Sequence, residues 1–581
     1  MNNCDLVFHY HDQTKHDYYR YAASLGHLDW DNQPNPFRRL IGSQLISLPL
    51  TEVHPSVEYD QLYSQKIQAR PVSVETISAL FFYSLALSAW KQYQDTSWAL
   101  RVNPSSGNLH PTEGYLVIDK IKGKCLLPGV YHYAPKEHGL ELRTEFGLGL
   151  WNELVEQLPQ GSFLVGLSSI HWRESWKYGE RAFRYCQHDI GHAWAALSIS
   201  ASMQGWKLQI LNTIPDEEIA QLLGLNRFND FEMKEKETPD LLAVIVPSHE
   251  TFKPGQSLKQ ESIQKIAKGK WFGKANKLNE EYYPWEIIDM VSDACEKQKS
   301  DCDIEKLSPI LFSDTHMVPT NDVKQERKNT FLAGQIIRQR RSAVAMDGVT
   351  SITKTQFYEM LSRVVPIKGS ILWDSIAQRP FIHLGLFVHQ VVGLVPGLYA
   401  LVRDPEKLSL IQTSMHSEFQ WKPPLECPQS LPLFLLEEKE VQNLAASVSC
   451  GQDIAGASAF SCGMLAEFEE SIRRFGAHWY RRLFWESGII GQVLYLEAEA
   501  KGVQATGIGC FFDNPVHDIF GLTGHSFQSL YHFTIGGSLE DDRLSTLPSY
   551  QHLASSMVDR KDEQDFMHFT NFISYPPYLI T

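Results

Sequence analysis

The sequence has few of the features that mark secreted or disulfide-rich proteins. Its nine cysteines are odd in number, widely scattered, and contain no Cys-x-x-Cys pair. We therefore expect reduced, mostly structural thiols in a cytoplasmic protein. The first residues also lack the basic and apolar regions that make up a signal peptide.

Long apolar runs and excess positive charge are absent as well. The longest apolar stretch, from Ile77 to Trp90, has about 14 residues and three serines, whereas a membrane span needs about 20. It predicts a buried helix, and no membrane partner is expected. The net charge of −15 argues against a nucleic-acid partner, and a bound phosphate would need a local cationic pocket. No Gly-x-Gly-x-x-Gly follows a predicted strand, so a Rossmann site is not indicated.

What the chain does have is a long internal repeat. Gly191 and Gly488 hold the same place in two similar segments, 297 positions apart (488 minus 191), and Gly205 and Gly502 share that spacing. This period is far too long for a solenoid. It predicts two fused domains that resemble the two subunits of a homodimer. A further match lies upstream, between residues 128–131 and residues 396–399.

We expect the chain to have three parts. Residues 1–250 form an N-terminal domain with an extended arm at its start. Residues 251–330, rich in Lys, Glu, Asp and Gln, form a linker that docks on the surface through its aromatic side chains. Residues 331–581 form a C-terminal domain with a tail. Predicted strands and helices interleave without regular βαβ spacing, which favours an α+β fold with a mixed sheet and packed helices.

Periodicity and turn residues predict the main elements of each half. Apolar residues at three-to-four spacing predict helices, short apolar runs predict strands, and Lys122-Gly123-Lys124 predicts a hairpin turn. Helices are expected at residues 75–92, 185–203, 354–364 and 481–500, and strands at residues 115–118, 130–133, 241–247, 384–388, 398–402 and 531–535.

A polar loop in the first half, residues 101–113, has no counterpart in the second half. Pro104 fixes its own φ, and Gly107 supplies a conformation that most residues avoid. Ser105, Ser106 and Asn108 offer short polar groups beside an exposed backbone. Such a loop suits the face or edge of a flat, hydrogen-bonding ligand, and a plain turn is the alternative.

Two segments of the second half could complete a binding site. Residues 338–342, Arg-Gln-Arg-Arg-Ser, form a cationic cluster that suits a phosphate, because guanidinium groups bind phosphate in a bidentate manner. A solvated basic run is the alternative. Residues 502–509 are rich in small residues that allow a ligand to approach the backbone, whereas the first-half counterpart lacks the later glycines. A helix C-cap followed by a glycine-rich strand is the alternative.

Together the three segments resemble the nitroreductase-like FMN flavoproteins. The resemblance implies a dimer-like arrangement with the flavin at the interface, and therefore a single site built from both halves. It assigns the phosphate to Arg340, Arg341 and Ser342, the face of the isoalloxazine to Pro104, Ser105, Ser106 and Asn108, and the neighbourhood of flavin N5 to Gly507, Ile508 and Gly509.

The chain departs from the family pattern at two places. Val344 stands where the family often has another arginine, so a further phosphate contact must come from elsewhere, with Arg543 as one candidate. The second-half counterpart of the loop, around residues 374–380, lacks the Pro-Ser pair. One FMN per chain is therefore expected.

Within this family, the first half is most similar to the azoline oxidases that form thiazoles and oxazoles. The similarity rests on residues 103–113 and 176–185, and it implies catalytic roles for Lys177 and Tyr178. The lysine could stabilise a reduced, anionic flavin or accept a proton, and the tyrosine could relay one. A surface turn before a helix is the alternative for this pair.

The expected function is that of an FMN-dependent oxidoreductase, an azoline-type dehydrogenase or oxidase acting on a peptide or a small heterocycle. Two alternatives are an NAD(P)H-dependent nitro or quinone reductase and a non-catalytic flavoprotein scaffold in a peptide-modifying complex. A third is a zinc hydrolase that uses His188 and His192, which are spaced as in zinc-binding helices. No third ligand follows at a recognisable spacing, so no metal is expected.

Overall fold

The structure is a computed structural model, and it describes most of the chain. The predicted turn at 122–124, part of the linker and most of the predicted tail lie outside the described residues. The described ranges are 2–50, 57–63, 67–121, 126–247, 252–253, 255–302, 331–366, 371–376 and 378–553.

Each half of the chain builds one large sheet, and the two sheets have the same strand order apart from one extra edge strand, β2. This equivalence confirms the predicted repeat. The first sheet runs β2 (Leu45–Ser47), β7 (Gly139–Glu145), β6 (Gly129–Ala134), β5 (Thr112–Ile118), β8 (Phe163–Ser169), β10 (Thr238–Val246) and β9 (Lys207–Ile210). The second runs β16 (Leu433–Glu438), β15 (Gly397–Leu401), β13 (Ile382–Val388), β17 (Phe460–Glu467), β19 (Phe527–Gly536) and β18 (Gln504–Ile508).

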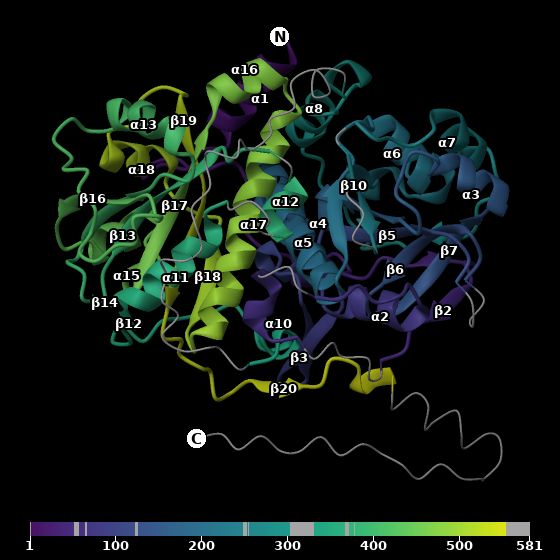
Figure 1. Ribbon diagram of the computed structural model, residues 1–581, viewed down its shortest axis with the longest axis horizontal. Helices are drawn as coiled ribbons and strands as arrows, with labels where there is room; N and C mark the ends of the chain where they lie inside the picture. Colours follow the sequence, from purple (N-terminus) through teal and green to yellow (C-terminus); the bar gives the residue numbers. More distant parts are fainter. Residues whose placement is uncertain are drawn as a thin grey trace.

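Helices pack between and around the sheets, so the predicted α+β class is confirmed (Figure 1). The sheets themselves are not mixed as expected, because every described pair within the two large sheets is antiparallel. Parallel pairing occurs in the small sheet of β12 (Ile352–Thr353) with β14 (Val391–Val392). Antiparallel neighbours need no long crossover helix, which explains the irregular spacing of elements along the chain.

Two buried helices lie side by side in the centre of the molecule (Figure 1). They are α5 (Ala182–Met203) and α17 (Trp479–Ala500), and each has 22 residues. Both are followed by a glycine with left-handed backbone, Gly205 at φ +72° and Gly502 at φ +74°, which ends the helix as a side chain could not without strain. The predicted helices at 185–203 and 481–500 are thus confirmed.

The remaining described helices pack around the sheets, and several of them, such as α4 and α11, pack on the central pair. In the first half they are α1 (Asn3–Gln13), α2 (Val74–Phe82), α3 (Leu148–Leu154), α4 (His171–Tyr178), α6 (Asp216–Leu223), α7 (Gln260–Ala267) and α8 (Glu286–Ala294). In the second they are α10 (Ala333–Gln339), α11 (Lys354–Val364), α12 (Ile371–Ile376), α13 (Leu408–Ser414), α14 (Gln442–Val448), α15 (Asp453–Gly456), α16 (Glu469–Phe475) and α18 (Asp513–Phe520).

The apolar stretch from Ile77 to Trp90 is not one helix, contrary to the prediction. Helix α2 ends at Phe82, and Ser84 then turns its hydroxyl back to the Leu80 carbonyl at 2.6 Å. Strand β3 (Leu87–Tyr93) follows and pairs with β4 (Thr96–Arg101). Cross-strand pairing therefore prevails over the local preference of this apolar run.

The ends of the chain cross over to the opposite half. The N-terminal arm begins with helix α1, which the sequence analysis did not predict, and His11 of α1 meets Gln528 of the second half at 3.1 Å. Near the C-terminus, β20 (Ser545–Leu547) pairs with β3 of the first half (Figure 1). In the region expected to be the linker, β11 (Lys274–Ala275) pairs with β1 (Leu40–Ile41). No helix in the described ranges is long and apolar enough to cross a bilayer.

Candidate active site

A cavity of about 580 Å³ lies between the two halves, with walls from both. Eleven of the twelve candidate site residues line it. Residues 340–342 and 507–509 come from the second half, and the loop residues and Tyr178 come from the first. Lys177 is the exception. Its side chain lies against the loop, where its Cδ would be 3.3 Å from a Cβ placed on Gly107. The lining residues are Pro104, Ser105, Ser106, Asn108, Tyr178, Arg340, Arg341, Ser342, Gly507, Ile508 and Gly509.

The first-half loop is held in a conformation that few residues adopt. Gly107 and Asn108 both have φ near +59°, and His110 has φ +53°. The Ser106 backbone N–H and hydroxyl donate to Asp189 Oδ1 at 3.1 and 3.2 Å, which ties the loop to α5. The Asn108 amide donates to the Ala99 carbonyl at 2.9 Å, so this side chain supports the loop itself. Consecutive left-handed residues and a buried anchor are more than a plain turn requires.

Three arginines at one side of the cavity form no ion pair with any described carboxylate. Arg340 and Arg101 are buried, Arg341 is partly buried, and none of the three forms an ion pair with a carboxylate among the residues described. The Nε–H groups of Arg340 and Arg101 are buried and donate to no partner among the residues described. Burial lowers the pKa of Arg101 and of Arg341 to about 10 each. Glu113 acts on Arg101, and Glu499 acts on Arg340 and Arg341, but neither carboxylate forms an ion pair with these arginines. Desolvated cations without a paired carboxylate favour a bound anion.

A further arginine, Arg101, lines the cavity from the first half. It is the last residue of strand β4, and the sequence analysis did not single it out as a site residue. Val344 lies at the cavity rim with 75% of its surface exposed. Arg543, the candidate from sequence, does not line the cavity and pairs with Asp541 at 2.7 Å on the surface. The first half thus supplies the cation that the second half lacks.

Tyrosine side chains explain why Gly507 and Gly509 carry no side chain. A Cβ on Gly507 would lie 2.6 Å from Cζ of Tyr531, and one on Gly509 would lie 2.8 Å from Cδ1 of Tyr185. The Gly507 N–H is not free for a ligand, because it donates to the Tyr495 hydroxyl at 3.0 Å. The sequence analysis missed these three tyrosines, because their role depends on packing against a distant segment.

Lys177 and Tyr178 end helix α4 directly behind the loop. The Lys177 ammonium lies 5.3 Å from the centre of the Tyr178 ring, and that ring packs on Tyr185 at 4.4 Å. Burial, followed by the nearby Glu174 carboxylate, raises the pKa of Tyr178 well above its ordinary value. Tyr178 is therefore a neutral hydroxyl at the cavity wall, able to donate a hydrogen bond.

Two buried carboxyl groups beside the loop were not singled out from sequence as site residues. Burial raises the pKa of Asp189 to about 7, although hydrogen bonds from Ser105 and Ser106 oppose the shift. Burial and the neighbouring Asp189 also raise the pKa of Glu174 well above its ordinary range. Asp189 lines the cavity and Glu174 lies behind Ser105, at 3.5 Å from its hydroxyl. This corner of the cavity can hold protons near neutral pH.

The two histidines considered for zinc make other contacts. His188 stacks on Tyr531 with ring centres 4.1 Å apart. His192 meets the Tyr531 hydroxyl at 3.2 Å and Gln492 at 3.3 Å. Within the described ranges no group of three His, Cys, Asp or Glu side chains could hold a metal ion.

Comparison with known proteins places this geometry in a familiar fold. A crystal structure of a candidate nitroreductase from Anabaena variabilis superposes over 92% of this chain and 99% of its own, with a TM-score of 0.65 and 20% identity. The chain has the fold of the nitroreductases. The fold expected from the resemblance is therefore confirmed, although no family model matches the sequence.

Two curated relatives match parts of the chain. A trifolitoxin-processing protein of Rhizobium leguminosarum is 27% identical over 224 residues, which cover 36% of this chain and 60% of that protein. A candidate nitroreductase of Methanocaldococcus jannaschii is 25% identical over 179 residues, which cover 30% of this chain and 89% of that protein. The chain thus spans only about three fifths of the first relative.

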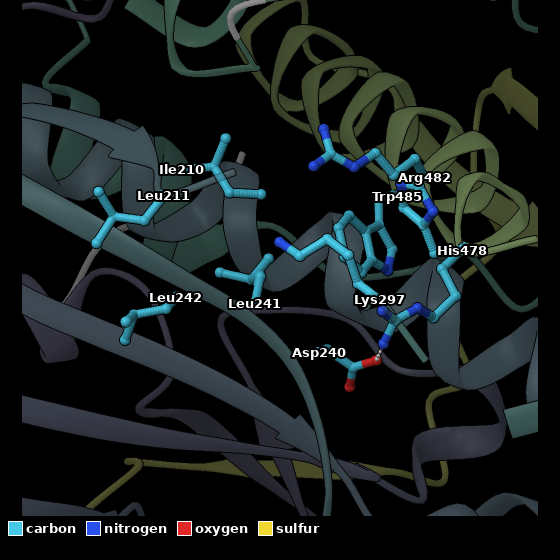
Figure 2. Close-up of a pocket in the computed structure, with 10 residues that line it drawn as sticks. Ile210, Leu211, Asp240, Leu241, Leu242, Lys297, His478, Arg482 and Trp485 are labelled. Atoms are coloured by element: carbon cyan, nitrogen blue, oxygen red, sulfur yellow. Dashed lines mark ion pairs between the residues drawn. The ribbon is translucent and has the colours of Figure 1, made fainter. Parts of the chain in front are cut away.

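The internal repeat relates the cavity to a second position in the molecule, where side chains leave almost no space. At the spacing of 297 residues, Gly507 corresponds to Ile210, and His188 corresponds to Trp485. The space there is only about 10 Å³ and is surrounded by large side chains (Figure 2). Trp485 donates from its indole to Gln187 at 2.6 Å, and Arg482 donates to Asn212 at 2.7 Å. Ile210 and Asn212 stand at the positions related to Gly507 and Gly509, and the space between the side chains there is too small for a flat ring.

Proposed function

We propose that this protein is an FMN-dependent oxidoreductase that binds one FMN in the cavity between its two halves. The observation that carries the proposal is a group of three cavity-lining arginines that form no ion pair with any described carboxylate: Arg101, Arg340 and Arg341. A phosphate monoester is the anion that such a group suits best, because each guanidinium can donate two parallel hydrogen bonds.

The other walls of the cavity fit a flat ring. The loop at 104–108 is anchored from behind by Asp189, and the strand end at 507–509 is packed from behind by tyrosines. These walls would hold the isoalloxazine between segments of opposite halves and keep water from it. When bound, FMN supplies an acceptor or donor of a hydride equivalent, which no side chain can provide.

The residues at the loop end of the cavity would handle protons. Tyr178 presents a neutral hydroxyl, Asp189 has a pKa near the operating range, and Lys177 places a cation behind the loop. The lysine would favour a negative charge on the reduced ring through the loop, and the tyrosine would donate to or relay a proton from the substrate.

An azoline-type oxidation of a ring in a peptide is the reaction we favour. The relative named as a trifolitoxin-processing protein, together with the resemblance of residues 103–113 and 176–185 to azoline oxidases, supports it. Reduction of nitro or quinone compounds with NAD(P)H is the second candidate, supported by the relative and the fold neighbour named for nitroreduction.

The test is the ratio of flavin to chain in the purified full-length protein. Flavin released by denaturation and counted against protein concentration should give one FMN per chain after incubation with excess FMN and removal of the unbound cofactor. A colourless protein that takes up no FMN would refute the proposal. Two FMN per chain would contradict the closed second position. Reduction of the bound flavin and its reoxidation by an acceptor would separate an enzyme from a non-catalytic scaffold.

A further inference from the structure

Two cysteines meet at the wall of the cavity. Cys510 lines the cavity next to Gly509, and Cys450 lies in the turn between α14 and α15. Their Sγ atoms are 2.6 Å apart, although 60 residues separate them in the chain. Both are only partly buried, whereas Cys186, Cys295, Cys302 and Cys462 are fully buried.

The surrounding backbone fixes both thiols in place. Cys450 has φ +56° and Gly451 has φ +69°, so the turn contains two consecutive residues with left-handed backbone. This conformation is strained for a cysteine but not for a glycine. On the other side, Gln452 donates to the Cys510 carbonyl at 3.1 Å, and Arg181 donates to the Gly509 carbonyl at 3.2 Å. The meeting of the two sulfurs is therefore held by contacts on both sides.

The charges around the pair make its two members unequal. Contact with the Cys450 thiol, followed by His16 and Arg181, lowers the pKa of Cys510 despite its partial burial. Contact with Cys510, followed by burial, raises the pKa of Cys450. Cys510 thus has the thiolate character that nucleophilic attack requires, and Cys450 holds the proton.

We propose that Cys450 and Cys510 form a reversible dithiol–disulfide site on the cavity wall, oxidised by exchange with a small-molecule disulfide. The Cys510 thiolate attacks one sulfur of that disulfide, a mixed disulfide forms, and the first small thiolate leaves. Cys450 then loses its proton and attacks the Cys510 sulfur, which expels the second small thiolate. The two cysteines lose two electrons in total, and the small disulfide gains them. Of its two thiolates, one takes up the proton that Cys450 releases and the other takes a proton from water.

The bond would connect the cavity wall to a separate turn. Cys510 directly follows the strand end at 507–509, and Cys450 belongs to the segment between α14 and α15. Oxidation would therefore tie this wall to a neighbouring part of the second half, while reduction would release it. The test does not depend on the proposed flavin, because it reads the oxidation state of the thiols.

The experiment uses the full-length protein, incubated with oxidised glutathione, alkylated, digested without reductant and analysed by mass spectrometry. We expect the peptides of Cys450 and Cys510 to be joined with the loss of two hydrogens in most chains, and dithiothreitol to separate them. Cys427, partly buried and bonded only to the carbonyls of Pro428 and Leu431, should instead remain free or carry a single glutathione.

Two variants make the result specific. C427S should leave the joined peptide unchanged, and C510S should abolish it and leave Cys450 alkylated. The proposal is overturned if Cys450 and Cys510 of the wild-type chain carry separate alkyl groups or separate glutathiones after oxidation. This outcome is read on the unmodified sequence, so it does not depend on the folding of either variant.

Discussion

Gly191 of α5 and Gly488 of α17 pack directly against each other. A Cβ on either glycine would come within 2.9 Å of the Cα of the other and would also overlap a backbone carbonyl of the facing helix. The two residues are the same position of the repeat, so the contact is reciprocal, as at the two-fold axis of a homodimer. The axis that relates the halves therefore passes close to this point, and the candidate cavity lies to one side of it.

We predict that Gly191→Ala destabilises the fold, because the facing backbone atoms cannot move as a flexible side chain would. Overpacking of this kind costs about 1–3 kcal/mol, and the midpoint of urea unfolding should fall accordingly. Gly149→Ala is the matched control, since Gly149 also lies in a helix but a Cβ there would meet nothing within 4 Å. Equal midpoints for the two variants would show that the helices can separate without cost.

Much of the fold could be predicted where the pattern is local or repeated. The helix at 354–364 and the two central helices follow from apolar periodicity, and the strand pairs follow from short apolar runs. The strand β3 could not be predicted, because its apolar residues suit a helix equally well until β4 and β20 pair with it. Helix α1 could not be predicted either, since it packs on residues more than 450 positions away.

The residues of the candidate site could likewise be predicted from the sequence only in part. The loop, the arginine cluster and the glycine-rich segment carry unusual residue types, so the sequence marks them. Arg101, Asp189 and Tyr531 are ordinary residues in ordinary elements, and only the three-dimensional arrangement brings them to the cavity. Tertiary contacts between halves leave no local signal in a single sequence.

We predict that Arg340→Met and Arg101→Met each weaken FMN binding at least tenfold, while the chain stays folded. Methionine preserves the packing of the side chain over Tyr495 or Phe37 but removes the positive charge of a residue that lines the cavity. A tenfold change corresponds to about 1.4 kcal/mol and is measured by quenching of flavin fluorescence on titration. Arg543→Met, at an exposed position outside the cavity, should leave the affinity unchanged. Equal FMN affinity in all three variants would show that Arg340 and Arg101 do not contribute to FMN binding.

We predict that Asp189 makes the fold less stable as the pH rises from about 4 to about 7. Burial raises its pKa from 3.8 to about 7. Below pH 4 it is therefore protonated in both the folded and the unfolded chain, and it does not change the free energy of unfolding. Between these values the unfolded chain releases the proton and the folded chain retains it, and above pH 7 the loss is complete. Asp189→Asn should therefore gain in Tm relative to the wild type across this interval.

The control for this pH dependence is Asp541→Asn. Asp541 is held by Arg543 at the surface, and its pKa is lowered to about 2, so its contribution to stability changes only at lower pH. The difference in Tm between D541N and the wild type should be constant from pH 5 to pH 8. A constant difference for D189N over pH 4 to 7 would mean that Asp189 is ionised in the folded chain throughout.

We predict that Lys177→Ala keeps the flavin but loses most of its turnover, because the side chain lies behind Gly107 and not among the cavity-lining residues. Its charge acts on the reacting centre across the loop, so kcat should fall at least tenfold while the FMN affinity stays within about twofold. Tyr178→Phe, which removes a hydroxyl from the cavity wall without changing its shape, should likewise lower kcat more than FMN binding. Lys207→Ala, at an exposed position of β9, is the control for the loss of a positive charge. Turnover with an azoline peptide and with a quinone plus NAD(P)H should be measured in parallel, and normal rates for Lys177→Ala with both substrates would exclude this lysine from the reaction.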